Sequence, residues 1–276
     1  MKTKLLGGLL AAAGIALSSS ASAIVVGGVD FGALGLTDHL ETTTVAETLI
    51  TGNGEELRGY GSVDRVNGNI NYGVGGARLF FVFDDYISTG FSPSTVGFLG
   101  GEIRVYIATG ADAGRNLLDF DSETNFAWIE SLTEWVSMTG HDNNGLAPGS
   151  TTLDSNGNLT GASISFSGSG LLDIDTTSGF GDPAVAAFLD ANTLPDNAIP
   201  ALIGGFADVA FTSSGNNFVL NQNDVCTGVS GEWCIQGTAN LRGKTVPVPE
   251  PGSIALLGAT MVGMGFVARK HLRAKK

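Results

Sequence analysis

Residues 101–108, Gly-Glu-Ile-Arg-Val-Tyr-Ile-Ala, alternate polar and apolar side chains. Glu102, Arg104 and Tyr106 occupy one set of positions, and isoleucine and valine occupy the other. Successive side chains of a β-strand point to opposite faces, so this period of two predicts a strand with one buried face and one wet face. Three more short segments, rich in β-branched or aromatic residues and bounded by turn formers, also predict strands: 78–83, 162–166 and 208–211.

Turn-forming dipeptides separate the predicted strands. Asn-Gly occurs at 53–54, 67–68, 144–145 and 156–157, and both residues tolerate the positive φ of tight hairpins. The chain of 276 residues contains 41 glycines, which argues against a mainly helical fold because each glycine destabilises a helix. We see no internal repeat, which disfavours solenoids and propellers. These features predict a mainly β domain, a β-sandwich of jelly-roll type with one or two short helices.

Two segments predict those helices. The first covers residues 123–136, with Asp121 or Ser122 as its cap. Its apolar residues have the spacing of one helical face: Trp128, Ile129, Leu132, Trp135 and Val136. The second begins at Asp182-Pro183, a capping residue followed by proline at the first helical position, and continues as Ala-Val-Ala-Ala-Phe-Leu.

The first 23 residues have the composition of a secretory signal peptide. Lys2 and Lys4 form a basic start, and residues 5–17 form an apolar segment rich in Leu, Ala and Gly. Ala21 and Ala23 flank Ser22 and supply the small residues of a cleavage site. We expect signal peptidase to cut after Ala23 and the mature chain to be exported.

The last thirty residues combine a Pro-Glu-Pro motif, an apolar stretch and a basic tail. Val248, Pro249, Glu250 and Pro251 precede the uncharged residues 252–268. As a helix this stretch is about 25 Å long, so we predict a single transmembrane helix whose cationic flank snorkels to the interface. The flank contains Arg269, Lys270, Arg273, Lys275 and Lys276. Cationic flanks resist translocation, which leaves the preceding chain on the exported side.

This order of features resembles the PEP-CTERM sorting signal of Gram-negative bacteria. The resemblance rests on residues 248–251, 254–268 and 269–276. It implies that an exosortase, a membrane-embedded cysteine protease, recognises the signal and cuts near Pro-Glu-Pro. It also implies the inner membrane as an intermediate location and the cell surface, outer membrane or extracellular matrix as the destination. An ordinary stop-transfer anchor is the alternative interpretation.

These assignments give a signal peptide (1–23), an exported domain (24–246) and a sorting signal (247–276). Of the 14 lysines and arginines, two precede Ala23 and five follow Pro251, whereas all 27 acidic residues lie between these positions. Seven positive and 27 negative charges give the intervening region a formal charge of −20. Such a surface repels nucleic acid and anionic lipid, and it attracts cations, Ca²⁺ in particular outside the cell. Alternatively, the charge only keeps an exported protein soluble.

Cys226 and Cys234 are the only two cysteines and lie eight positions apart in the exported domain. In an oxidising compartment this pair predicts a disulfide that closes a small hairpin or loop. The spacing does not match the Cys-x-x-Cys motif of redox catalysts.

The sequence contains little that is typical of a catalytic site. It lacks Gly-x-Ser-x-Gly and His-Glu-x-x-His, and the exported domain has only two histidines, His39 and His141. Carboxylates that could form a glycosidase pair lie at 84 and 85, at 119 and 121, and at 173 and 175. Acidic residues at strand ends are expected in so acidic a chain, so we predict no catalytic residues and no enzymatic activity.

A short polar segment suggests a calcium site. Asp154, Asn156 and Asn158 place oxygen side chains at alternate positions, as at the start of a calcium loop. Position 12 of that pattern is Ser165 rather than an acid. The alternative is a hairpin that turns at Asn156-Gly157.

Trp233, beside Cys234 in a glycine-rich loop, is the tryptophan whose ring we expect to contact a sugar if the protein binds one. Trp128 and Trp135 lie on the apolar face of the predicted helix and are assigned to the core.

Taken together, the sequence predicts a non-catalytic, exported and surface-sorted protein. By resemblance, its setting is a biofilm or exopolysaccharide matrix, where it has a structural or adhesive role. A calcium-assisted carbohydrate-binding module and a secreted glycan hydrolase are the alternatives. Signal peptidase and exosortase are the expected processing partners, and extracellular polysaccharide is the candidate ligand. No cofactor is predicted apart from the Ca²⁺ alternative.

Overall fold

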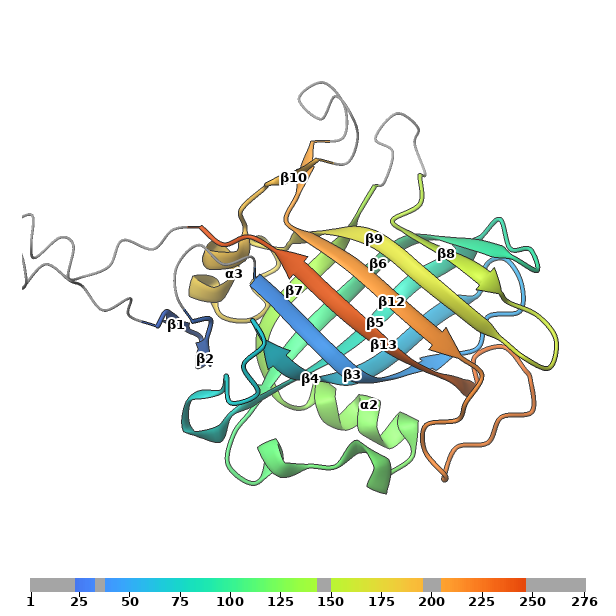
Figure 1. Ribbon diagram of the computed structural model, residues 1–276, viewed down its shortest axis with the longest axis horizontal. Helices are drawn as coiled ribbons and strands as arrows, with labels where there is room; N and C mark the ends of the chain where they lie inside the picture. The colour runs from blue at the N-terminus through green and yellow to red at the C-terminus, as the bar shows by residue number, and fades with distance from the viewer. Residues whose placement is uncertain (1–22, 33–37, 143–149, 196–204, 247–276) are drawn as a thin grey trace, which may run out of the picture. The chain divides into compact units, whose positions relative to one another are not determined.

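A long antiparallel hairpin of β5 (Arg78–Thr89) and β6 (Thr95–Ala108) lies in the middle of the sheet (Figure 1). The strands predicted at 78–83 and 101–108 are confirmed. They are also neighbours in the sheet, where Leu79 pairs with Ile107 and Phe83 pairs with Ile103. The computed structural model describes residues 23–32, 38–142, 150–195 and 205–246. The described residues all belong to one unit, which ends at Val246.

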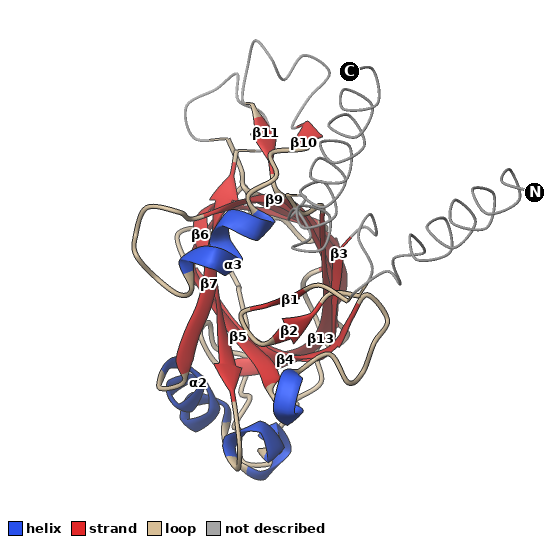
Figure 2. Cartoon of the chain, turned by 90° about the vertical axis from the view of Figure 1, so that its left-hand side faces the viewer, coloured by secondary structure: helices blue, strands red, loops and turns tan. Residues whose placement is uncertain are grey.

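Within the described part of the chain, nine antiparallel strands form a single sheet that closes on itself. The order is β12-β13-β3-β4-β5-β6-β7-β9-β8, and β12 also pairs with β9 along its whole length. The sheet is therefore a cylinder (Figure 2). The remaining strands of the cylinder are β3 (Asp38–Thr48), β4 (Glu56–Val66), β7 (Thr133–His141), β8 (Leu153–Asn158), β9 (Ser165–Ile174), β12 (Val209–Asn216) and β13 (Trp233–Gly243).

Strand β8 shares its two neighbours, β6 and β9, with β7. The first half of β6 pairs with β8 and its second half pairs with β7, and β9 is divided between the same two partners. Thus β7 and β8 both lie between β6 and β9, each pairing with a different part of these two longer strands.

Short elements complete the described chain: β1 (Val25–Val26), β2 (Val29–Asp30), η1 (Val74–Gly76), η2 (Asp112–Gly114), η3 (Leu117–Asp119), β10 (Leu194–Pro195) and β11 (Phe206–Ala207).

The mainly β composition and the two short helices are confirmed, but the jelly-roll sandwich is wrong. A sandwich buries the inner faces of two separate sheets, whereas here each inner face packs against the opposite wall of the same sheet. Burial alternates along a strand in both arrangements. The sequence period therefore could not distinguish them.

One end of the cylinder is plugged by the start of the described chain. Figure 2 looks along the cylinder from this end, with β1 and β2 inside the ring of strands. Val29 is fully buried, and Trp135 of β7 donates its Nε1–H to the Gly27 carbonyl at 2.9 Å. Helix α3 (Pro183–Leu189) covers the same end, where Phe188 meets Phe31 edge to face with ring centroids 5.0 Å apart.

Helix α2 (Ser122–Glu130) covers the outer face of β4 to β6. Beneath it lies the outer cluster, which consists of Ala46, Tyr60, Phe80, Val82, Tyr106, Ala108, Leu117, Phe126 and Ile129. Within residues 79–83 of β5, the odd-numbered side chains face the interior and the even-numbered ones face this cluster, which explains the unbroken apolar run. The wet face predicted for β6 is correct at Glu102 and Arg104, which are partly exposed, and wrong at Tyr106, which is buried.

The first predicted helix is shorter than expected. Asp121 caps it by accepting from the Thr124 N–H at 2.9 Å, but α2 ends at Glu130 and β7 begins at Thr133. Trp135 and Val136 therefore belong to a strand and face the interior. Their helical spacing from Trp128 is a coincidence, because Trp128 lies in helix α2 and they lie in strand β7. The second helix, α3, has the predicted Asp182 cap and Pro183 start.

The predicted turns at 53–54 and 67–68 are confirmed. Asn67 (φ 49°) and Gly68 (φ 76°) both have positive φ between the bridged residues Val66 and Asn69. The turn at 156–157 is wrong, because these residues lie within β8 and pair with β9. Strand β9 begins at residue 165 rather than 162, and β12 extends the strand predicted at 208–211 to residue 216.

Other predictions concern parts of the chain that the structure does not describe. The Asn-Gly pair at 144–145, most of the signal peptide and the predicted transmembrane helix lie outside the described residues. Among the residues that are described, no helix combines the length and apolarity needed to cross a bilayer.

The contact between β4 and β5 generates a packing prediction. A Cβ on Gly59 would lie 2.0 Å from the Phe83 ring and 2.8 Å from the Ala46 carbonyl oxygen. We expect Gly59→Ala to lower the free energy of unfolding by about 1–3 kcal/mol, measured by denaturant titration. Gly114→Ala is the control, because no described residue lies within 4 Å of its new Cβ. Equal effects of the two substitutions would contradict the close packing of Phe83 on β4.

Candidate functional site

The interior of the cylinder contains a cavity toward the end opposite α3. Its volume is about 60 Å³, and its walls are mainly apolar, with side chains that include Leu57, Phe83, Phe98, Ile103, Leu153 and Phe211. The partly exposed Ile50, Phe91 and Ile164 also line it and come from the loops after β3, β5 and β8. These loops lie at the right-hand end of the cylinder in Figure 1. The cavity is thus bounded by strand residues inside and by loop residues toward the solvent.

One carboxyl group lies in this apolar lining. Strand alternation in β3 places Val45 and Glu47 on the inner face, with Ala46 between them in the outer cluster. Glu47 is held between Gly59 of β4 and Ile235 of β13, and it is only 4% exposed. Among the described residues, none donates a hydrogen bond to its carboxylate. Glu47 is therefore a buried acid without a partner in the part of the chain that is described.

Burial raises the pKa of Glu47 to about 7. The cause is desolvation, because a carboxylate moved from water into an apolar wall loses its hydration and gains no compensating hydrogen bond. Tyr86 is the other titratable side chain in the lining, and burial raises its pKa as well. Ser155 and Ser213 add hydroxyl groups, and Ser155 donates its own to the Ser167 carbonyl at 3.4 Å.

Sequence reasoning missed Glu47 entirely. It follows Thr-Thr-Thr-Val-Ala in an acidic chain, and no local motif separates it from a surface glutamate. The available signal was its position two residues after Val45, which places both on one face of a strand. That signal becomes informative only when the strand is known and its inner face is known to be buried.

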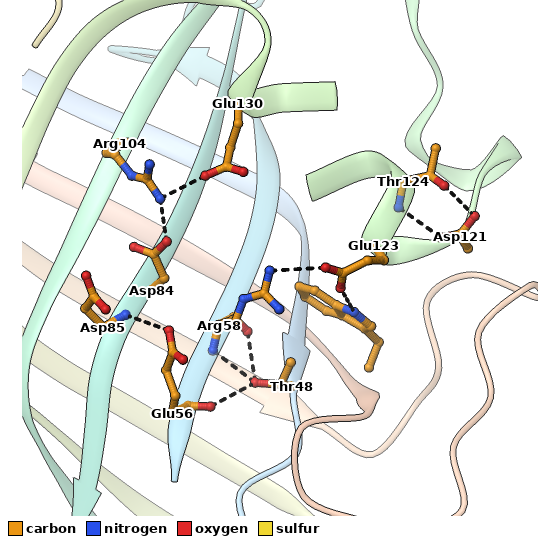
Figure 3. Close-up of polar contacts among 11 residues, drawn as sticks. Thr48, Glu56, Arg58, Asp84, Asp85, Arg104, Asp121, Glu123, Thr124 and Glu130 are labelled. Atoms are coloured by element: carbon orange, nitrogen blue, oxygen red, sulfur yellow. Dashed lines mark hydrogen bonds and ion pairs between the residues drawn. The ribbon is translucent and has the colours of Figure 1, made fainter. Parts of the chain in front are cut away.

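A second cluster of acids lies on the outer wall and surrounds Arg104 (Figure 3). The guanidinium contacts Asp84, lies 3.0 Å from the Glu130 carboxylate and lies 3.8 Å from that of Glu102. Desolvation raises the pKa of Asp84 and of Glu102, and the charge of Arg104 opposes both shifts. Carboxylate oxygens of Asp84, Asp85 and Glu102 lie within 4.8 Å of one another, but Arg104 already supplies the positive charge there. The cluster ties α2 to β5 and β6.

The other carboxylates proposed for hydrolysis also make local contacts. Asp119 accepts from the Asn116 side chain at 3.0 Å, and Asp121 caps α2. Asp173 lies 2.8 Å from Nδ1 of His141. Hydrogen bonds from Ser178 and Thr177 lower the pKa of Asp175 to about 2. Each of these acids has a partner in a cap, a turn or a hydrogen bond to a histidine.

The ring of Trp233 packs into the outer wall. Its centroid lies 5.4 Å from that of Tyr60 and 6.0 Å from that of Phe126, and its Nε1–H donates to Glu123 at 3.1 Å. Glu123 also binds Arg58, 3.3 Å away (Figure 3). These contacts fix Trp233 against α2 and β4, and sugar binding by its ring stays a prediction.

The disulfide between Cys226 and Cys234 is confirmed, with an S–S distance of 2.10 Å and a Cα–Cα distance of 5.2 Å. It closes a loop between β12 and β13. Within that loop the Glu232 carboxylate accepts hydrogen bonds from Thr227, Gly228 and Val229, which lower its pKa.

The segment proposed as a calcium loop is extended. Asp154, Asn156 and Asn158 all lie in β8, where side chains two residues apart are separated by about 7 Å. Ligands of one Ca²⁺ lie within 2.3–2.6 Å of the ion and hence within about 5 Å of one another. Asn158 instead donates to the Ser163 carbonyl. The three residues therefore do not adopt the turn of a calcium loop, and calcium binding by them stays a prediction.

The C-terminal residues match a known family model. The model for the PEP-CTERM protein-sorting motif matches residues 247–270. The chain carries this sorting motif. A protein with this motif is exported and sorted to the cell surface through exosortase. No curated protein and no solved structure matches the chain.

The motif contains most of the residues that the sequence singled out for sorting. Residues 248–251, Arg269 and Lys270 lie within the matched segment, and Arg273 lies beyond it. None of them belongs to the described residues, and neither does Ala21. Ala23 is described and exposed, at the start of the described chain.

The buried carboxyl generates a prediction on pH and stability. Below pH 4.5, Glu47 is protonated in both the folded and the unfolded chain and contributes nothing. Between pH 4.5 and about 7 only the unfolded chain ionises, so wild-type stability falls as the pH rises and then stays lower. We expect Glu47→Gln to raise the free energy of unfolding at pH 8 by up to about 3 kcal/mol relative to its effect at pH 4.

Denaturant unfolding of both proteins at pH 4 and pH 8 measures this difference. Glu134→Gln, which alters an exposed glutamate of β7, is the control and should change stability by a similar small amount at both values. An effect of Glu47→Gln that is the same at pH 4 and pH 8 would show that this carboxyl is solvated.

Proposed function

We propose that the protein acts outside the inner membrane, at the cell surface or in the extracellular matrix, as a structural or binding protein without catalytic activity. The observation that carries this proposal is the sorting motif at 247–270, which directly follows the last described strand and its short extension to Val246. The motif directs export and sorting, and we assign the function at the destination to the domain formed by the closed sheet.

The contacts of the acidic residues support a non-catalytic role. Glycosidases use two carboxyl groups that flank the scissile bond, one of them with a raised pKa. On the outer wall, the acids with raised pKa, Asp84 and Glu102, share Arg104 as a partner. Glu47 lies in the interior cavity, and among the described residues no second acid lines that cavity. These arrangements favour stability and binding over bond cleavage.

The charge of the exported domain supports an extracellular setting with neutral or cationic partners. A formal charge of −20 between the two terminal signals repels polyanions over about 10–30 Å at low to moderate salt. A matrix polysaccharide without strong negative charge fits this surface. The structural or adhesive role in an exopolysaccharide matrix follows from that fit and from the sorting route.

Processing is tested by the intact mass and location of the protein in its native host. We expect the wild type to lose residues 1–23 and the segment after the Pro-Glu-Pro motif, and to leave the inner membrane. Pro249→Ala combined with Glu250→Ala should retain the C-terminal mass and accumulate in the inner membrane, because exosortase recognition is lost.

Lys244→Ala is the matched control, since this exposed residue lies just before the matched segment. It should be processed like the wild type. A wild-type protein that keeps Lys276 and stays in the inner membrane would overturn the proposal. Normal processing of the double variant would show that Pro-Glu-Pro is not the recognised element.

A further inference from the structure

The two ends of the cylinder interior are filled differently. At the α3 end, the β1–β2 hairpin, Phe31 and Trp135 pack the interior. Toward the other end, the side chains of the surrounding strands leave the cavity of about 60 Å³. A water molecule needs about 10–15 Å³ of such space and two to four polar partners, so the volume suffices for several waters but the apolar walls provide few partners. This space suits a small apolar molecule better than a water cluster.

Glu47 is unexplained by the stability of the fold. Its neighbours on the inner face, Val45, Phe83 and Ile235, are apolar, and an apolar residue at 47 would pack there without loss of hydration. The carboxyl is almost fully buried, lines the cavity and has no donor among the described residues. A donor that enters the cavity would offset the cost of burying the acid.

The position of Glu47 sets the orientation of such a guest. On β3, β5 and β6, the lining includes Glu47, Phe83 and Ile103 but not the next inner residues toward the plugged end, Val45, Phe81 and Val105. Glu47 therefore lies at the inner end of the cavity. A guest that reaches it places its polar head deep in the cylinder and its apolar part toward Phe91 and the other loop residues.

The entrance is held in place before any guest arrives. The Phe91 N–H donates to the Asn53 side chain at 2.7 Å, and the Ser88 hydroxyl donates to the Gly52 carbonyl at 2.8 Å. These bonds join β5 and its following loop to the loop between β3 and β4. On the other side, the Ile164 N–H donates to the Asn217 side chain at 3.1 Å. A site whose walls and entrance are already ordered loses little entropy when it binds a ligand.

We propose that the interior cavity binds one small apolar molecule that carries a hydrogen-bond-donating head, an amine or an alcohol, and that Glu47 accepts this hydrogen bond. The acid disfavours a carboxylate head, because two carboxylates would repel each other inside an apolar wall. The negative domain surface adds to this preference by attracting cations and repelling anions. This inference names a ligand class for the proposed binding role, and it rests on the proposal that the protein is a binding protein.

Three probes of equal chain length distinguish the possible heads: hexylamine, hexan-1-ol and hexanoate. Their binding to the protein isolated from its host is measured by calorimetry at pH 8. Every variant is isolated by the same procedure. We expect hexylamine or hexan-1-ol to bind at least about tenfold more tightly than hexanoate, as a hydrogen bond to a charged group predicts. The stronger of the two identifies a cationic or a neutral head.

Glu47→Gln keeps the shape of the side chain, and we expect it to weaken hexylamine binding by about tenfold. Glu47→Leu should abolish the preference for hexylamine over hexanoate, and Glu134→Gln should change nothing. If none of the probes binds the wild type, or if hexanoate binds best, the inference is overturned. It is also overturned if the probe preferences of Glu47→Leu equal those of the wild type. Because the wild type and all variants are isolated in the same way, these outcomes do not depend on where exosortase cuts.

Discussion

Pairing between β9 and β12 is the constraint on which the rest of this structure depends. The ladder runs from Leu172 opposite Val209 to Ser165 opposite Asn216 and joins segments separated by α3 and the β10–β11 ribbon. It removes the edges that an open sheet would expose. It also gives every strand an inside and an outside. Without it, the inward-facing side chains of β3, β5 and β6 would lack an opposite wall.

Closure also explains why different elements pack against the inner and the outer face of the sheet. The inside is filled by the sheet itself and by the β1–β2 hairpin, and the outside of β4 to β6 is covered by α2. Hydrogen bonds among Tyr60, Ser122 and Asn125 and the ion pairs of Arg104 fix α2 on this wall. The interior is not filled completely, and the remaining cavity contains one acid, Glu47. The site is thus a consequence of closure and not of a local motif.

Local features of the fold could be predicted from the sequence, and non-local ones could not. The alternation at 101–108, the caps Asp121 and Asp182 and the Cys226–Cys234 bridge each depend on residues close in the chain. Closure depends on pairing between distant strands, for which one sequence contains no direct signal. The end of α2 was misjudged because Trp135 and Val136, on β7, continue the helical spacing by coincidence. Glu47 was missed because a glutamate becomes unusual only when its surroundings are apolar.

The central claim is that closure encloses Glu47 in an apolar interior. The most direct test is a pH titration of the Glu47 side-chain carboxyl by carbon-13 NMR, with the resonance assigned by its loss in Glu47→Gln. The account predicts a midpoint near pH 7 in the protein without added ligand. A midpoint near 4.5, the ordinary value for glutamate, would show that water reaches this carboxyl and would contradict the enclosed cavity.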